Sequence, residues 1–94
     1  MVKATLIYRD KASLPDGGIV EMTIWQLSEP SSERPHGLKY SLYYGRDGHR
    51  IVGYDNETGK GDHRHLRELE EVYRFTTIEQ LMADFLADVE RERL

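Results

Sequence analysis

The chain has 94 residues, no cysteine and a formal net charge of −4 at pH 7, and these properties exclude several classes of protein. Residues 1–94 are expected to form one domain, because a chain of this length has too few residues for two hydrophobic cores. The lack of cysteine excludes a disulfide framework and a cysteine nucleophile, and the negative charge argues against nonspecific nucleic-acid binding through a global positive field.

The cellular location is predicted from the same features. The first five residues contain no apolar signal core with a cleavage site, and no segment approaches the roughly 20 apolar residues that span a membrane. Small secreted domains usually depend on disulfides, which this chain does not have. We therefore expect a soluble, cytoplasmic protein with no membrane partner.

The first part of the chain has the composition of a β-hairpin. Residues 3–14 and 19–27 are β-rich, and the intervening Pro15-Asp16-Gly17-Gly18 favours a tight reversal. Alternation along the second run predicts two faces, with Trp25 on the face turned away from the core. The face predicted to enter the core carries Val20, Met22 and Ile24.

A second hairpin is predicted after a loop. Residues 30–37 have loop composition, and residues 38–44 alternate as a half-buried strand. Residues 45–49 supply a turn, and residues 50–54 continue as the return strand. These segments predict four antiparallel strands in a meander.

The last third predicts a short strand and one helix. Residues 72–75 form a short β run that is expected to pair with the sheet, and Thr76-Thr77-Ile78-Glu79 matches a capping box. One helical stripe is apolar and is expected to pack on a sheet face, with Asp84, Asp88, Glu90 and Glu92 facing water. The predicted fold class is α+β: an antiparallel β-sheet of about four to five strands, packed by a C-terminal amphipathic helix.

The polar chemistry of the chain is concentrated in residues 54–65. This segment holds a phenol, two aspartates, a carboxamide, two glycines, two cations and two imidazoles. Residues 46–67 have a formal charge near +1, whereas the remainder of the chain is near −5. An anionic ligand could therefore bind locally, particularly if the histidines are protonated.

Two histidines two residues apart suggest acid–base catalysis. In an extended segment the period of two places His63 and His65 on one face and sends Arg64 to the other. Near neutral pH one imidazole can act as base and the other as acid, as cleavage of a phosphodiester through an RNA 2′-hydroxyl requires. The predicted catalytic residues are His63, His65 and the orienting Asp55, with Tyr54, Asn56, Lys60, Arg64 and Arg50 as substrate contacts; no metal or cofactor is included.

Other interpretations of these residues stay open. His63 and His65 could belong to an exposed polar loop with no site, or could bind a metal ion together with an aspartate. A phosphate-binding loop at Gly59-Lys60-Gly61 is excluded, because glycine occupies the position where Ser or Thr should follow the lysine. A noncatalytic module is a further alternative, in which a protein or nucleic acid binds an aromatic surface of Trp25, Tyr40, Tyr43 and Tyr44.

The order of these motifs resembles the TumE family of small bacterial and archaeal toxins. The resemblance rests on the paired tyrosines Tyr43-Tyr44, on Tyr54-Asp55-Asn56, on a glycine-bearing loop and on Asp62-His63-Arg64-His65. It implies a type II toxin–antitoxin system, in which a cognate antitoxin, commonly a helix-turn-helix DNA-binding protein, neutralises the toxin. By analogy with other small toxins, RNA is the expected target. A homodimer that uses the spare sheet face is compatible with this hypothesis.

Overall fold

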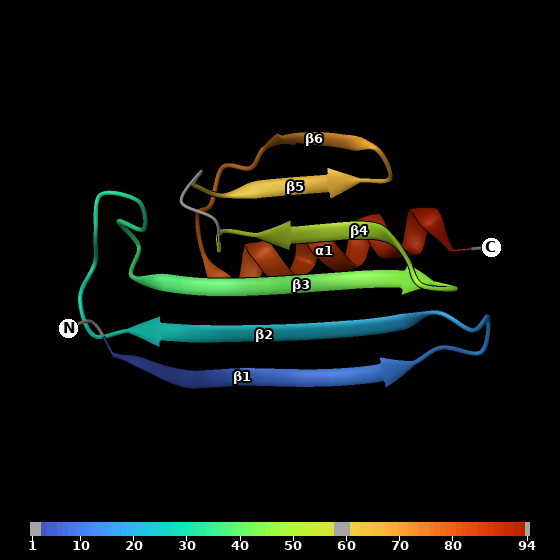
Figure 1. Cartoon of the computed structure of the whole chain (residues 1–94), viewed down its shortest axis with the longest axis horizontal. Coiled ribbons are helices and arrows are strands. Elements are labelled where there is room, and N and C mark those ends of the chain that lie inside the picture. The colour runs from blue at the N-terminus through green and yellow to red at the C-terminus, as the bar shows by residue number, and fades with distance from the viewer. Residues whose placement is uncertain (1–2, 58–60, 94) are drawn as a thin grey trace.

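Six antiparallel strands and one helix make up the part of the chain that this computed structural model describes, residues 3–57 and 61–93 (Figure 1). The strands follow one another in the order β1-β2-β3-β4-β5-β6, which is a meander. The predicted fold class, an α+β antiparallel sheet with a C-terminal helix, is confirmed. The elements are β1 (Ala4–Ser13), β2 (Ile19–Leu27), β3 (Leu38–Arg46), β4 (His49–Asp55), β5 (His63–Leu66), β6 (Leu69–Val72) and α1 (Ile78–Glu92).

The sheet has more strands than the four to five that the sequence predicted. The difference is a second short hairpin, β5 and β6, which adds to the edge of β4. Arg67 turns the chain between these strands at a φ of +53°, and its N–H donates to the carbonyl of Ile51 over 2.8 Å. The predicted strand at residues 72–75 is wrong beyond Val72, where β6 ends.

The helix covers one face of the sheet and leaves the other open. Figure 1 shows α1 behind β3 and β4, and the strands lie in front of it. We call the face turned away from α1 the open face. The side chains predicted to enter the core from the second strand are buried on the helix side, which confirms that prediction. The buried apolar residues are Val20, Met22, Ile24, Leu38, Tyr40, Leu42, Tyr44, Ile51, Val52, Tyr54, Leu81, Phe85 and Val89.

The start of the helix and one of its acidic residues differ from the prediction. The N-cap is Thr77, whose Oγ1 accepts the Gln80 N–H over 3.0 Å, so the capping pattern begins one residue later than predicted. Asp88 was expected to face water but is only 2% exposed. Its burial is explained by polar partners from β4 and β5, which sequence periodicity does not reveal.

Candidate functional site

The open face carries both histidines of the predicted pair. His63 and His65 on β5 lie opposite Asp55 and Gly53 of β4, while Arg64 lies opposite Tyr54. Directly opposite residues share a face, so the two imidazoles lie on one side of the sheet and Arg64 lies on the other. This is the arrangement that the period of two predicts for an extended segment.

The imidazole of His65 is held between a cation and two carboxylates. The Arg50 guanidinium lies 3.1 Å from His65 Nδ1, and His65 Nε2 lies 3.7 Å from Asp55 Oδ2 and 3.4 Å from Glu70 Oε2. Because a guanidinium only donates, Nδ1 is the acceptor and the neutral ring carries its proton on Nε2. The side chain of His65 is 13% exposed, so these contacts fix the orientation of a largely buried ring.

A glycine makes the contact between Arg50 and His65 possible. Gly53 lies between Tyr43 and His65 across the sheet, and a Cβ atom at Gly53 would lie 2.8 Å from Cδ of Arg50. The aliphatic part of Arg50 therefore occupies the space above this residue. Any larger residue would push the guanidinium away from the imidazole.

His63 has the complementary proton arrangement. Its Nδ1 lies 2.8 Å from the Gly61 carbonyl oxygen, so Nδ1 carries the proton and Nε2 holds the lone pair of the neutral ring. Within the described residues, Nε2 of His63 has no hydrogen-bond partner. The pair thus combines a ring able to accept a proton at Nε2 with a ring able to donate one at Nε2.

Asn56, predicted to contact substrate, has a structural role instead. It is 1% exposed; its Oδ1 accepts the Tyr40 N–H over 3.0 Å, and its Nδ2 donates to the Leu38 carbonyl over 2.8 Å. These bonds tie the end of β4 to β3. The position of Asn56 therefore does not support direct contact with a ligand.

A partly buried polar network that the sequence did not predict lies beside Asn56. The Asp62 carboxylate accepts the Tyr40 hydroxyl over 2.6 Å and lies 3.0 Å from His36 Nε2. His36 Nδ1 accepts the Leu38 N–H over 3.1 Å, so this ring donates from Nε2. Burial, followed by the hydrogen bond to Asp62, raises the pKa of Tyr40 above its ordinary value. A single histidine in a loop gave no sequence signal for this network.

Tyr54 and Arg64, also predicted to contact substrate, lie on the helix side of the sheet. The Tyr54 hydroxyl donates to Asp88 of α1, and Arg64 Nε lies 3.0 Å from the same carboxylate. Arg64 also reaches Glu71 over 3.2 Å, and Arg91 pairs with Asp88. The structure thus separates Tyr54 and Arg64 from the histidine pair and uses them to attach α1 to the sheet.

The comparison with known protein families decides the assignment. Residues 2–93 match the family described as "Toxin TumE". The chain belongs to the TumE toxin family. This family assignment makes it a toxin of a toxin–antitoxin system and implies an antitoxin partner. No curated protein and no solved structure gives a significant match to the chain.

Two further findings on this TumE chain concern a possible metal site and a possible membrane-spanning helix. Across residues 3–57 and 61–93, no group of three or more His, Asp or Glu side chains is arranged to hold a metal ion. In the same ranges, no helix is long and apolar enough to cross a membrane. Lys60, the remaining predicted substrate contact, lies outside the described residues.

The aromatic surface of this TumE chain is smaller than predicted. Tyr40 and Tyr44 are fully buried on the helix side, so they do not form part of an exposed surface. Tyr43 and Trp25 point to the open face and keep part of their surface exposed. Only these two aromatic residues of the predicted set can therefore meet a ligand on the open face.

Proposed function

We propose that this toxin acts on RNA as a metal-independent endoribonuclease whose acid–base pair is His63 and His65. The observation that supports this proposal is the pair of imidazoles on the open face, in which His65 lies between Arg50 and the carboxylates of Asp55 and Glu70. A cation, a base and an acid are the groups that intramolecular cleavage of RNA requires.

The proton positions suggest a role for each group. Nε2 of His63 takes the proton of a ribose 2′-hydroxyl, and the 2′-oxygen attacks the adjacent phosphorus. His65, as an imidazolium protonated at both ring nitrogens once Arg50 has turned from Nδ1 to the phosphate, gives its Nε2 proton to the departing 5′-oxygen as the bond from phosphorus to that oxygen breaks. The products are a 2′,3′-cyclic phosphate and a free 5′-hydroxyl. Arg50 stabilises the charge on the phosphorane oxygens. Asp55 positions the ring of His65 before substrate binds, because its carboxylate faces Nε2, the nitrogen that then donates to the 5′-oxygen.

The histidine pair is tested by growth arrest and by RNA cleavage. His63→Ala and His65→Ala should each abolish both effects, because general acid or base catalysis contributes roughly a hundredfold to ten-thousandfold. His49→Ala is the matched control, because His49 is an exposed histidine at the start of β4. His49→Ala should unfold at a temperature close to the wild type, and circular dichroism checks that His63→Ala and His65→Ala are folded at the assay temperature, because both rings are largely buried. Full toxicity of both active-site variants contradicts the enzymatic proposal.

The exposed aromatic side chains favour a second candidate, a noncatalytic module that binds protein or nucleic acid. Tyr43 and Trp25 on the open face support this alternative, since aromatic residues are enriched at binding hot spots. It predicts toxicity that survives both histidine substitutions and is lost when Tyr43 or Trp25 is replaced by alanine. RNA cleavage by the purified wild-type chain, absent in His65→Ala, excludes this alternative.

The antitoxin is proposed to be a helix-turn-helix DNA-binding protein encoded beside this gene. The resemblance to the TumE family supports this proposal, since such partners are common in that family. Co-expression with the adjacent open reading frame should restore growth, and the two chains should copurify. Growth arrest that persists when the adjacent protein is present contradicts the proposal.

A further inference from the structure

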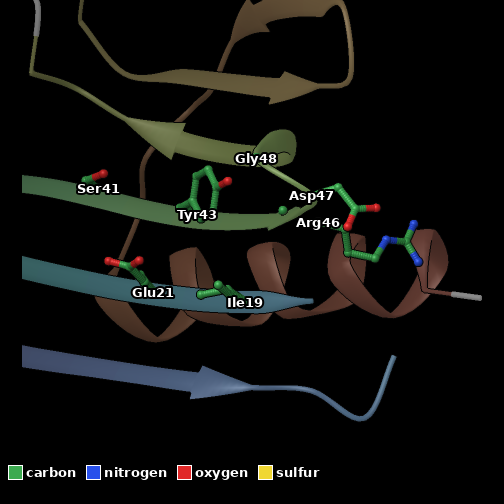
Figure 2. Close-up of a pocket in the computed structure, with 8 residues that line it drawn as sticks. Ile19, Glu21, Ser41, Tyr43, Arg46, Asp47 and Gly48 are labelled. Atoms are coloured by element: carbon green, nitrogen blue, oxygen red, sulfur yellow. The ribbon is translucent and has the colours of Figure 1, made fainter. Parts of the chain in front are cut away.

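A hollow of about 360 Å³ lies on the open face, beside the row of residues that contains His65 (Figure 2). Its walls include Tyr43 and Ser41 of β3 and Ile19 and Glu21 of β2. Figure 2 shows these side chains on the side of the sheet that faces away from α1. A hollow of this size is within the usual range for small-ligand sites of about 300 to 1,000 Å³.

The aromatic wall of the hollow is set by a glycine. A Cβ atom at Gly45 would lie 2.6 Å from Cζ of Tyr43, so the phenol ring lies over this glycine along the strand. The ring thus borders the hollow instead of extending into solvent. An aromatic wall of this kind provides the stacking surface on which proteins bind unpaired bases.

The polar wall of the hollow matches the edge of a nucleobase. Glu21 lies directly opposite Tyr43, and its carboxylate can only accept hydrogen bonds, as an exocyclic amino group requires. Ser41 adds a hydroxyl that both donates and accepts. Glu21 is also held by Lys11, whose Nζ lies 3.8 Å from its Oε1.

The hollow and the histidine site occupy one cross-strand row. Glu21 lies opposite Tyr43, Tyr43 opposite Gly53, and Gly53 opposite His65. Tyr43 and His65 are thus two strand spacings apart, roughly 10 Å. One nucleotide can cover this distance from its phosphate to its base. The guanidinium of Arg50 lies between the two positions, next to His65.

The distribution of charge makes the open face less negative than the face covered by α1. Helix α1 carries five carboxylates and one arginine, a net charge of −4 on the opposite side of the sheet. The strands of the open face carry four basic side chains and three acidic ones. The basic set is Arg9, Lys11, Lys39 and Arg50, and the acidic set is Glu21, Asp55 and Glu70.

We infer that the hollow beside Tyr43 binds an unpaired nucleobase of single-stranded RNA, next to the phosphate held at His65 and Arg50. The inference rests on the proposed function, because it identifies the form of RNA that the same site takes. Duplex RNA is excluded as the ligand, since a base in a helix cannot present its ring face to Tyr43. Lys39 and Trp25, which lie opposite each other further along β3 and β2, extend the same surface.

The inference is tested by binding without cleavage. Four 2′-O-methyl homopolymers resist attack through the 2′-oxygen, and their affinity for the purified chain is measured by fluorescence anisotropy. Tyr43→Leu should weaken binding roughly tenfold through loss of stacking. Tyr43→Phe, the matched control, should bind within about twofold of the wild type because it keeps the aromatic ring. Glu21→Gln should change the order of affinity among the four bases, because a carboxamide also donates.

Duplex RNA and heparin are the competitors that separate base recognition from charge attraction. Both should displace the oligonucleotide poorly at equal phosphate or sulfate concentration. The inference of a base pocket is overturned if heparin competes as well as the unlabelled oligonucleotide. It is also overturned if the wild type, Tyr43→Leu and Tyr43→Phe bind with identical affinity. If a homodimer closes the open face, the affinity for the oligonucleotide falls as the protein concentration rises. That result also overturns the inference of a base pocket. Binding without cleavage of normal RNA refutes only the enzymatic proposal, while cleavage unaffected by Tyr43→Leu refutes only the pocket.

Discussion

Two glycines on the open face should respond differently when a methyl group is added. At Gly53 the new Cβ atom meets only the side chain of Arg50, 2.8 Å away at Cδ. At Gly45 it would lie 2.5 Å from the carbonyl oxygen of His49, which belongs to the backbone of the β3–β4 hairpin. A flexible side chain can move away at little cost, whereas a paired backbone cannot.

Gly53→Ala is therefore expected to impair the proposed catalysis without impairing the fold. The added methyl group moves the Arg50 guanidinium away from His65. The loss of this charge-stabilising donor should reduce the rate of cleavage by roughly a hundredfold to a thousandfold. The melting temperature should stay near that of the wild type. Gly45→Ala is the contrasting variant and should lose roughly 1 to 3 kcal/mol of stability through overpacking. Unchanged cleavage by a folded Gly53→Ala variant contradicts the role given to Arg50.

Asn56 should be required for stability. Replacing it with alanine leaves the buried Tyr40 N–H and Leu38 carbonyl without their partners, and each unsatisfied group costs about 1 to 3 kcal/mol. Asn56→Ala is expected to lower the free energy of unfolding by roughly 3 kcal/mol in a urea titration. Glu57→Ala, at the exposed neighbouring position, should change it by less than about 0.5 kcal/mol. A loss below about 1 kcal/mol for Asn56→Ala contradicts this assignment.

At the level of elements, two ion pairs among the described residues attach the helix to the β5–β6 hairpin: an exposed one between Arg67 and Glu92, and one between Arg64 and the buried Asp88. Asp88 is buried on α1 and is contacted by Arg64 from β5, by the Tyr54 hydroxyl from β4 and by Arg91 of the same helix. A buried charge of this kind is costly if a single partner is removed. Replacing both partners with apolar residues of similar volume is often neutral.

This asymmetry gives a prediction for the contact between α1 and β5. Asp88→Leu should cost roughly 1 to 3 kcal/mol, because it removes the buried partner of Arg64 and of the Tyr54 hydroxyl and leaves the partly exposed guanidinium with Glu71 alone. The double variant Arg64→Met/Asp88→Leu should recover most of that loss, as measured by chemical unfolding monitored by circular dichroism. Additive losses in the double variant contradict a coupled ion pair.

The sequence predicted the amphipathic elements and missed those held by polar contacts. Strands β2 to β4 and helix α1 follow from alternation and helical periodicity, because each buries one apolar face. Strand β1 is exposed along nearly its whole length and was predicted from its β-rich composition and from the turn that joins it to β2. The β5–β6 hairpin escaped prediction, since β6 is exposed along its whole length and alternation needs a buried side. The pairing of His63 and His65 on one face followed from local geometry, whereas the contacts of Asp88 with Arg64 and of His36 with Asp62 join residues 24 or more positions apart.

At the level of the whole molecule, buried phenols make the fold sensitive to alkali. Burial raises the pKa of Tyr40, Tyr44, Tyr54 and Tyr73, and hydrogen bonds to Asp62 and Asp84 add to this effect for Tyr40 and Tyr73. Burial brings the pKa of Tyr54 to about 12, despite the Arg64 guanidinium, which lowers it. Each of these phenols is therefore protonated in the folded chain over a range where the unfolded chain ionises.

The free energy of unfolding is accordingly expected to fall above pH 10. Below that pH both states keep the Tyr54 proton; above it the unfolded state releases the proton first, so stability declines as the pH rises from the ordinary pKa of 10.0 to about 12. At 1.4 kcal/mol per pH unit, Tyr54 alone accounts for roughly 2 to 3 kcal/mol of the decline. Urea titrations between pH 8 and pH 12 measure this decline in the free energy of unfolding. In Tyr54→Phe the free energy of unfolding should fall less steeply with pH, although it starts from a lower value at pH 8. In a Tyr8→Phe/Tyr43→Phe variant, which lacks the two partly exposed tyrosines that show no such burial, tyrosinate absorbance should appear together with unfolding. Absorbance that rises in this variant while the chain is still folded contradicts the buried, hydrogen-bonded state of the remaining phenols.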